Sequence, residues 1–298
     1  MRILVTGNRG QVATSLLERA AGTDIEIIAL GRPRLDLADR EGVLSACERL
    51  AFDAIINAAA YTAVDKAETD ERTAMLVNAQ GAAHVAEAAA RKAVPLLHLS
   101  TDYVFDGSSD RPYVETDITG PTSVYGRSKL AGEQMLARIH ADHAIFRTGW
   151  VYSPFGSNFV RTMLRLGETR DEISVVADQF GNPTSALDIA DALLRAARLL
   201  VPDSSTSLRG IFHMTGGGET SWAGLAEATF AAAARNGSAP VRVRRISSAE
   251  YPTQARRPHN SRLDNSKIHG VYDITLPSWE SSLRNCVDRL APGRRSVL

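Results

Sequence analysis

Cysteine is scarce in this chain of 298 residues, with Cys47 and Cys286 as the only two. They lie far apart in the sequence and have no histidine or cysteine beside them at a metal-ligand spacing, which argues against a disulfide framework and a zinc cluster. No apolar run approaches the roughly 20 residues that a membrane-spanning helix needs. We therefore expect neither a disulfide-stabilised fold nor a membrane protein.

An excess of charge of either sign is also missing, since 34 basic residues balance 34 acidic ones. This balance removes the general electrostatic reason for binding nucleic acid or an anionic membrane. Met1 leads directly into a strand pattern rather than into the pattern of a signal peptide, and we expect a cytoplasmic location. Basic residues gather only in the last quarter, where they either meet a phosphorylated ligand or form a solvated face: Arg242, Arg244, Arg245, Arg256 and Arg257.

Short apolar runs alternate with longer segments of helical period in the first half of the chain. This alternation predicts an α/β fold, with parallel strands joined by crossover helices in a doubly wound Rossmann sheet. A long Ala-rich helix is expected at 70–91. The expected strands are Arg2–Thr6, Ile25–Leu30, Ala54–Asn57, Leu96–Ser100 and Ala144–Thr148.

After Trp150, glycines and prolines divide the chain into shorter pieces. We predict a dinucleotide-binding domain at 1–150 and, mainly within 151–298, a smaller α/β lobe that binds substrate. Residues 186–200 still have the pattern of a long amphipathic helix and 210–214 that of a strand. The segment 186–214 is therefore expected to return to the first domain, so that the boundary is interleaved.

A glycine loop, Thr6-Gly-Asn-Arg-Gly-Gln-Val-Ala13, follows the first predicted strand and precedes an amphipathic helix. Gly7 permits a tight turn and Gly10 lets the backbone approach a pyrophosphate, while small Ala13 lets the helix lie close to the strand. The helix N-terminus offers free N–H groups to the anion. The order of strand, glycines and helix favours a dinucleotide site over a turn that only joins two elements.

The second strand ends in Gly31-Arg-Pro-Arg34, where dinucleotide-binding proteins often carry an acidic residue for the ribose hydroxyls. Arg32 can pair with a ribose 2′-phosphate, so we prefer NADPH as the cofactor and keep NADH as the alternative. Asp36 and Leu37, a little later, are the alternative neighbours of the adenine or ribose.

Tyr125 and Lys129 are four residues apart and therefore about one helical turn apart on the same side of a helix. A phenol is a poor acid–base catalyst at neutral pH, but a nearby cation favours phenolate and lowers its pKa. Lys129 also has the reach to hold a nicotinamide ribose. The pair predicts proton transfer that is coupled to hydride transfer.

The fourth strand ends in Ser100-Thr-Asp-Tyr-Val-Phe-Asp-Gly107, at the carboxyl edge where open α/β sheets bind ligands. Thr101 is placed to donate a hydrogen bond to a substrate carbonyl beside Tyr125; the alternative is a turn that ends the strand. Trp150 follows the fifth strand and either stacks on a sugar or base or packs as an ordinary aromatic residue. His98 is expected to be a core histidine.

Taken together, these segments resemble the extended short-chain dehydrogenases and, more narrowly, the dTDP-4-dehydrorhamnose reductase family. The likeness extends over almost the full length. Its segments are Gly10-Gln-Val12, Asn57-Ala-Ala-Ala-Tyr-Thr-Ala-Val-Asp-Lys-Ala-Glu68, 100–107, the Tyr125/Lys129 pair, Arg147-Thr-Gly-Trp-Val-Tyr152, Asp178-Gln-Phe-Gly-Asn-Pro-Thr184 and Arg257-Pro-His-Asn-Ser-Arg-Leu-Asp264.

The resemblance implies that the 4-keto group of a dTDP-linked 6-deoxyhexulose is reduced by NAD(P)H. It implies that Tyr125 protonates the oxygen with assistance from Lys129 and Thr101, and that Thr101, Asp102, Trp150 and the late arginines, Arg257 among them, contact the substrate. The implied dinucleotide contacts are Gly10, Gln11, Val12, Asp36, Leu37, Ala60, Tyr61 and Thr62.

One departure from the family concerns Ser15, which stands where some members carry a metal-binding glutamate at a dimer contact. We therefore expect no bound metal, and the sequence leaves a monomer and a homodimer open. Ala13, where the family usually has glycine, is a milder departure.

Two other functions fit the same motifs. One is a non-catalytic nucleotide-binding subunit, like the regulatory partner of methionine adenosyltransferase, and the retained Thr101, Tyr125 and Lys129 argue against it. The other is a UDP-sugar epimerase, which shares the fold and the Tyr/Lys pair but retains its NAD through the catalytic cycle. The sequence does not indicate which 4-keto sugar is used or which stereochemistry the product has.

Overall fold

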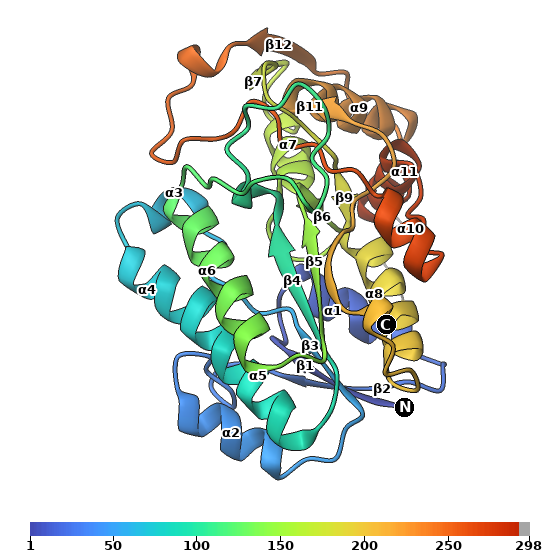
Figure 1. Cartoon of the computed structure of the whole chain (residues 1–298). Coiled ribbons are helices and arrows are strands. Elements are labelled where there is room, and N and C mark those ends of the chain that lie inside the picture. Colours follow the sequence, from blue (N-terminus) through green and yellow to red (C-terminus); the bar gives the residue numbers. More distant parts are fainter. Residues whose placement is uncertain (292–298) are drawn as a thin grey trace.

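The computed structural model describes residues 1–291, and residues 292–298 at the end of the predicted second lobe lie outside this range. A six-stranded sheet, in which every neighbouring pair is parallel, forms the centre of the molecule (Figure 1). The strand order is β10-β5-β4-β3-β1-β2. The strands are β1 (Arg2–Thr6), β2 (Glu26–Leu30), β3 (Ala54–Asn57), β4 (Leu96–Thr101), β5 (His143–Thr148) and β10 (Gly210–His213).

Helices cover both faces of this sheet, as the doubly wound prediction required. On one face, α1 (Gln11–Ala20) packs beside α8 (Ala186–Leu200) over a core that includes Ile3, Val5 and Phe146. On the other face, the core contains Leu4 and Ile55. The helices of that face are α2 (Arg40–Glu48), α5 (Gly81–Lys92) and α6 (Val124–Ile139).

The long helix expected at 70–91 contains an interruption that its pattern does not reveal. It consists of α4 (Glu71–Met75), a π-helical turn η1 (Leu76–Gln80) and α5. Asn78 lies in the π turn, and its side chain bonds to both backbone groups of Tyr61. π turns are often found at functional sites. Here the turn directs a buried amide toward the segment that follows β3.

The later chain returns to the central sheet twice. β10 pairs with β5 after α8 has crossed the sheet, and α10 (Ser266–Tyr272) then packs near β10. Ile268 and Tyr272 of α10 belong to the same core as α1 and α8. The sequence predicted the return of α8 and β10 but not that of α10. A helix of seven residues is too short for its apolar periodicity to indicate which face is buried.

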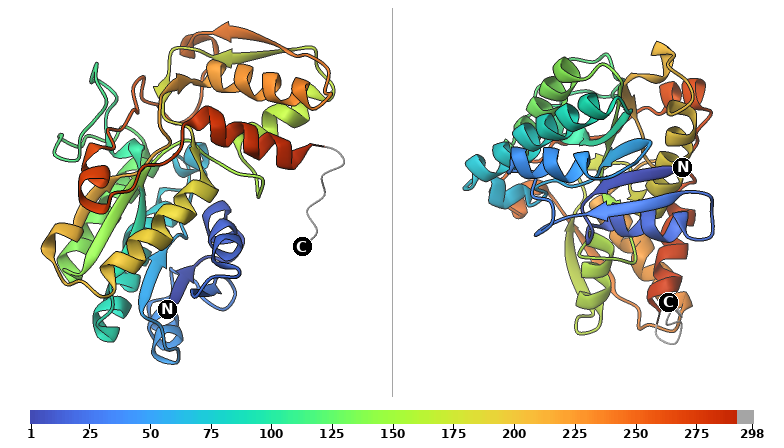
Figure 2. Two further views of the ribbon diagram at one scale, coloured as in Figure 1. Left: turned by 90° about the vertical axis from the view of Figure 1, so that its right-hand side faces the viewer. Right: turned by 90° about the horizontal axis from the view of Figure 1, so that it is seen from below.

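The remaining elements form a smaller α/β layer above the carboxyl edge of the sheet (Figure 2). In it, β12 (Arg242–Ile246) pairs in parallel with β7 (Glu172–Val176), and helices pack beside this pair. The other elements are the strands β6 (Val151–Tyr152), β8 (Phe180–Gly181), β9 (Thr184–Ser185) and β11 (Thr220–Ser221) and the helices α7 (Phe159–Gly167), α9 (Trp222–Arg235) and α11 (Trp279–Leu290).

Short helical turns complete the described chain. They are α3 (Val64–Ala67), η2 (Asp102–Val104), η3 (Thr206–Leu208) and η4 (Ser248–Glu250). No helix within residues 1–291 is both long enough and apolar enough to span a membrane.

Candidate active site

The glycine loop lies at the carboxyl end of β1, where α1 begins. Gly7 has a φ of +93°, a conformation that side chains rarely adopt, and nothing lies within 4 Å of the position a Cβ would take at Gly10. No side chain caps α1, and within residues 1–291 the N–H groups of its first three residues, Gln11, Val12 and Ala13, have no acceptor. These open amides fit the pyrophosphate of a dinucleotide.

The side chain of Gln11 joins the glycine loop to the second lobe. Its Oε1 accepts hydrogen bonds from the Ser153 hydroxyl at 2.8 Å and the Asn158 amide at 2.9 Å. Its Nε2 donates to the Val151 carbonyl at 3.4 Å. The Gln11 side chain is therefore occupied by contacts within the protein. For a dinucleotide, Gln11 has its backbone N–H to offer, together with that of Val12.

The segment after β2 lies beside the glycine loop, since the Gly7 N–H donates to the Leu30 carbonyl at 2.6 Å. Arg32 is exposed and has no hydrogen-bonding partner among the described residues. Asp36 accepts from the Ala38 N–H at 3.0 Å, while Leu37 is buried. Arg32 thus presents the free charge that a 2′-phosphate requires.

Ala60, Tyr61 and Thr62 follow β3 at the same edge of the sheet. Asn78 fixes this segment by accepting from the Tyr61 N–H at 2.8 Å and donating to the Tyr61 carbonyl at 3.0 Å. The same amide donates to Ser128 of α6 at 2.9 Å. Asn78 is a residue that the sequence reasoning missed, because an asparagine within an Ala-rich helical pattern has no local signal for a buried role.

Tyr125 and Lys129 lie in the first two turns of α6, which the Ser123 hydroxyl caps by accepting from the Gly126 N–H at 3.1 Å. Tyr125 is partly buried and packs edge-to-face against Tyr103 at 6.0 Å. Lys129 is buried and donates to the Leu99 carbonyl at 2.6 Å. The helix therefore brings the pair to the sheet edge, but the ammonium points into the sheet.

The expectation that Lys129 lowers the phenol pKa is wrong for this arrangement. Burial raises the pKa of Tyr125 to about 12, a hydrogen bond with Thr101 opposes this rise, and the Asp102 carboxylate adds to it. The charged group that acts on the phenol is thus Asp102 rather than Lys129. Burial also lowers the pKa of Lys129 to about 8, which the neighbouring charge of Glu133 opposes.

Thr101 and Asp102 come directly after one another at the end of β4. Thr101 Oγ1 donates to Asp102 Oδ1 at 2.9 Å and accepts from the Tyr103 N–H at 3.2 Å. Asp102 is 3% exposed, and burial raises its pKa to about 6. A Cβ at Gly149 would lie 2.6 Å from Asp102 Oδ2, so the carboxylate requires glycine at the end of β5.

Trp150 has a left-handed backbone with φ of +50°. Its ring stacks on Trp222 of α9, with 3.6 Å between the ring centroids and 3° between the planes. Its Nε1 donates to the Ser261 hydroxyl at 3.1 Å, and a Cβ at Gly181 would lie 2.5 Å from the indole. These contacts fix the position of the Trp150 ring, and Trp222 covers one of its two faces.

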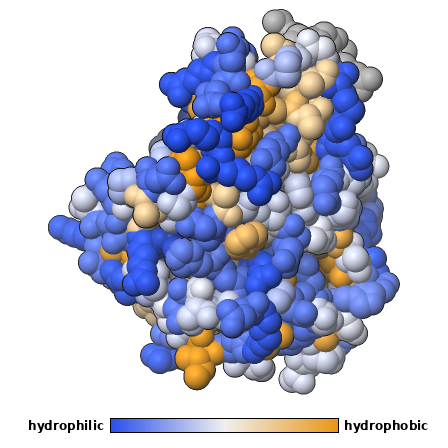
Figure 3. Space-filling view, turned by 90° about the horizontal axis from the view of Figure 1, so that it is seen from above, coloured by the Kyte–Doolittle hydropathy of each residue, from blue (hydrophilic) through white to orange (hydrophobic). Residues whose placement is uncertain are grey.

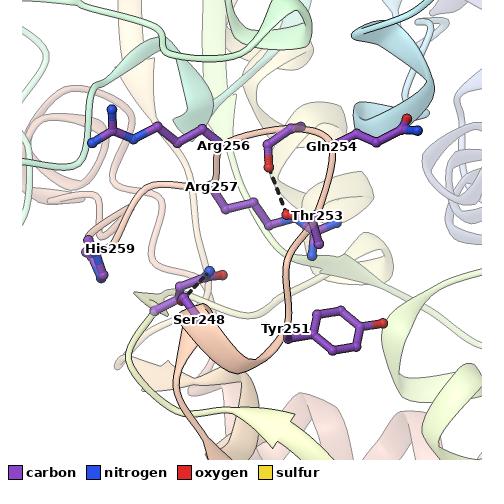
Figure 4. A pocket seen from close by; sticks show the side chains of 9 residues that line it. Ser248, Tyr251, Thr253, Gln254, Arg256, Arg257 and His259 are labelled. Atoms are coloured by element: carbon purple, nitrogen blue, oxygen red, sulfur yellow. Dashed lines mark hydrogen bonds between the residues drawn. The ribbon is translucent and has the colours of Figure 1, made fainter.

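Arg257 lines a pocket of about 320 Å³ formed mainly by the loop 248–259 (Figure 4). Its guanidinium donates to Asp65 Oδ2 at 2.8 Å, and the other oxygen of Asp65 accepts from the Ala255 N–H at 3.1 Å. Asp65 of α3 therefore attaches this loop to the first domain. The lining residues are Gln179, Ser248, Tyr251, Thr253, Gln254, Ala255, Arg256, Arg257 and His259.

The arginines of β12 lie apart from this pocket on the outer strand. Arg242 pairs with Glu172, Arg245 pairs with Glu227, and Arg244 donates to Ser174. Their arrangement is that of a solvated, ion-paired face rather than a phosphate site. The upper face of the molecule is mainly hydrophilic, with apolar residues in small groups (Figure 3).

Three residues discussed in the sequence analysis, Ser15, Cys47 and Cys286, are buried in the interior of the protein. Ser15 is buried and donates to the Gln11 carbonyl at 2.8 Å. Cys47 and Cys286 are buried free thiols. Within residues 1–291 there is no group of three or more His, Cys, Asp or Glu side chains arranged to hold a metal ion.

Comparison with known proteins shows the same likeness over the whole described chain. The family model of the RmlD substrate binding domain matches residues 1–291. A dTDP-4-dehydrorhamnose reductase of Sinorhizobium fredii is 52% identical over 287 residues, which cover 96% of this chain and 97% of that protein. One of Escherichia coli K12 is 40% identical over 297 residues, covering 97% and 98%.

Solved structures of the same family have the same fold as this chain. A dTDP-4-dehydrorhamnose reductase from Clostridium acetobutylicum is 36% identical with a TM-score of 0.90, covering 97% of this chain and 99% of that one. The enzyme from Bacillus anthracis, solved in complex with NADP, is 34% identical with the same TM-score and coverage. In sequence and in fold, this chain belongs to the dTDP-4-dehydrorhamnose reductase family.

Proposed function

We propose that this protein is an NADPH-dependent reductase of a dTDP-4-keto-6-deoxyhexose, with dTDP-4-dehydrorhamnose as substrate and dTDP-L-rhamnose as product. The observation that carries the proposal is the meeting of an open glycine loop, Thr101 and Tyr125 at one sheet edge, in a chain with 52% identity to a curated reductase. NADH remains the alternative cofactor.

The residues of the cofactor site fit a dinucleotide phosphate. The amides at the start of α1 would hold the pyrophosphate, and exposed Arg32 would pair with the 2′-phosphate. The segment 60–62, which Asn78 fixes, and the segment Asp36–Leu37 would border the adenosine. When bound, NADPH supplies the hydride; the residues of this chain orient the ketone and provide the proton.

Tyr125 is the proton donor in this proposal. With a pKa raised to about 12, the phenol keeps its proton at neutral pH and is ready to act as an acid when the ketone oxygen becomes negative. Thr101, which is hydrogen-bonded to Tyr125, would orient the same oxygen. Lys129 would hold the nicotinamide ribose from the neighbouring turn of α6.

The substrate would lie between the two lobes, with Asp102 and Trp150 beside the sugar and Arg257 near the diphosphate. In this proposal residues 1–150 together with 186–214 bind the cofactor, and 151–298 mainly bind substrate. We also propose a cytoplasmic location, where nucleotide sugars and NADPH are available. A monomer and a homodimer are both compatible with it.

The proposal is tested by incubating the protein with NADPH and enzymatically made dTDP-4-keto-6-deoxyglucose, with and without a 3,5-epimerase. Stoichiometric NADPH oxidation that depends on the epimerase supports reduction of dTDP-4-dehydrorhamnose. Oxidation without the epimerase identifies a different 4-keto sugar. Absence of oxidation in both mixtures contradicts the reductase and favours a nucleotide-binding regulatory subunit, and turnover without net oxidation favours an epimerase.

A further inference from the structure

A line of polar side chains crosses three neighbouring strands of the central sheet, β1, β3 and β4. Thr6 of β1 is the register partner of Asn57 in β3, and Asn57 is the register partner of His98 in β4. All three side chains are buried. Register partners in parallel strands present their side chains on the same face of the sheet, so the three form a continuous row.

Each side chain in this row bonds to the next. Thr6 Oγ1 lies 2.6 Å from Asn57 Oδ1, and Asn57 Nδ2 lies 3.0 Å from His98 Nδ1. At its far end, His98 Nε2 lies 3.4 Å from Lys129 Nζ. The row therefore connects Thr6, the first residue of the glycine loop, to the amine of Lys129 in α6.

The row also determines which nitrogen of His98 carries the proton. Thr6 Oγ1 accepts from the Ala59 N–H at 3.1 Å and donates its own proton to Asn57 Oδ1. Asn57 then presents its NH₂ group to His98, whose Nδ1 must accept. Burial keeps the pKa of His98 well below its usual range, so the ring is neutral and its proton lies on Nε2.

An N–H of His98 consequently faces Lys129. A neutral amine accepts this N–H, whereas an ammonium has only donors to offer it. Among the neighbouring groups, Glu133 of α6 pairs with Arg147 of β5 at 2.7 Å, Asp102 of η2 acts on Tyr125, and His143 of β5 acts on His98 after burial and Lys129. Glu133 is the neighbour that favours the charged form of Lys129.

We propose that His98 is a positioning residue for Lys129, and that the row Thr6–Asn57–His98 favours the neutral amine by turning an N–H toward it. The inference deepens the proposed reductase function, on which the catalytic meaning of Lys129 rests. Its physical content, the effect of one histidine tautomer on the protonation state of one lysine, concerns the cofactor-free chain and is measured without turnover.

The chain has four lysines, at positions 66, 92, 129 and 267, so Lys129 is accessible to direct titration. Protein labelled with ¹³C at the lysine ε-carbon is titrated by NMR, and the Lys129 signal is assigned by its loss in Lys129→Met. The His98→Phe variant keeps a ring of similar volume and removes both nitrogens. We expect the pKa of Lys129 to rise by about one unit, because the neutral amine loses its donor.

Two further variants complete the test. Thr6→Val removes the hydroxyl that orients Asn57, and the Lys129 pKa is expected to rise by a smaller amount, which keeps the proposal testable if His98→Phe does not fold. His140→Phe is the matched control, since its Nε2 contacts the Val94 carbonyl at 2.9 Å at the other end of α6. It is expected to leave the Lys129 signal unchanged.

A Lys129 pKa that falls or stays constant in His98→Phe overturns the proposal, because a fall means that Nε2 accepts from the ammonium. The ¹⁵N shifts of His98 in the wild-type chain provide a second measurement: a protonated Nδ1 also overturns it. Either result leaves NADPH oxidation by the wild-type protein untouched, so failure of this inference is distinguishable from failure of the proposed function.

Discussion

Arg147 and Glu133 form a buried ion pair between β5 and α6, with Nε–Oε1 and Nη2–Oε2 distances of 3.0 and 2.7 Å. Both side chains are 2% exposed, and the Ser100 hydroxyl donates to the same carboxylate. The arginine also lies over the ring of Phe105 at 5.2 Å. This pair fixes α6, and with it Tyr125 and Lys129, against the sheet.

Breaking the pair from one side is expected to destabilise the fold strongly. Arg147→Met leaves the Glu133 carboxylate buried without its partner, which costs about 3 to 5 kcal/mol in the free energy of unfolding. Urea unfolding followed by circular dichroism measures this loss. The double variant Arg147→Met/Glu133→Leu should recover part of it; a double variant less stable than the single one would contradict this account.

Tyr125→Phe is expected to lower kcat by about 10²-fold or more, since it removes the proton donor and keeps the ring. The Kd for NADPH, measured by fluorescence titration, should stay within about twofold. Tyr103→Phe, which alters the ring packed edge-to-face on Tyr125, is the matched control. Normal turnover in Tyr125→Phe would remove the tyrosine from its role.

Arg32→Ala is expected to reduce the preference for NADPH over NADH by about tenfold, because one charge-assisted contact to the 2′-phosphate is lost. The kcat/KM values for the two cofactors measure this change. Arg34→Ala, on the same exposed segment, is compared in parallel. If the preference changes only in Arg34→Ala, the phosphate contact belongs to Arg34.

Trp222→Ala removes the ring that stacks on Trp150 at 3.6 Å. An aromatic pair contributes about 0.5 to 1.5 kcal/mol, so we expect the substrate KM to rise by up to about tenfold as Trp150 loses its orientation. The KM for NADPH should not change. Phe159→Leu, which alters another neighbour of Trp222, is the control; equal effects of both variants would indicate general loosening of the lobe.

Asp102 is expected to make stability depend on pH, since burial raises its pKa from 3.8 to about 6 on folding. Between about pH 4 and about pH 6 the folded chain holds a proton that the unfolded chain has lost, so this group makes stability fall as pH rises. The shift corresponds to a loss of about 3 kcal/mol across the window.

The Asp102→Asn side chain does not take up this proton. The free energy of unfolding of the variant should therefore lack the part of the fall between about pH 4 and about pH 6 that comes from Asp102. The difference in unfolding free energy between variant and wild type, measured across the same pH window, isolates the contribution of Asp102. His213, whose pKa burial lowers to about 3, titrates in both proteins and cancels in the difference. A difference that is constant with pH would show that Asp102 keeps an ordinary pKa.

Local patterns in the sequence were sufficient for the sheet and the main motifs. The predicted strand Ala54–Asn57 and helix 186–200 match β3 and α8, and the strand expected at 210–214 ends one residue earlier as β10. Parallel strands buried on both faces appear as short apolar runs, and helices between them keep a helical period. The order of strand, glycines and helix at the start of the chain likewise predicted the glycine loop between β1 and α1, because this pattern also lies within a few neighbouring residues.

The environment of each side chain had no such local signal. Spacing alone placed Tyr125 and Lys129 one helical turn apart, yet burial and the Leu99 carbonyl, and not the spacing, decide that the ammonium points into the sheet. Likewise, only the packing of α9 against Trp150 decides that one face of this ring is covered.

The sequence by itself determined the kinds of groups this protein possesses and their order along the chain, because periodicity and turn chemistry act over a few neighbouring residues. The tertiary structure decided their charge states and partners. Thr6, Asn57 and His98 are 51 and 41 residues apart, and they become one row only when β1, β3 and β4 align in register. Burial and hydrogen bonding shift a pKa through such long-range contacts, which no local pattern contains.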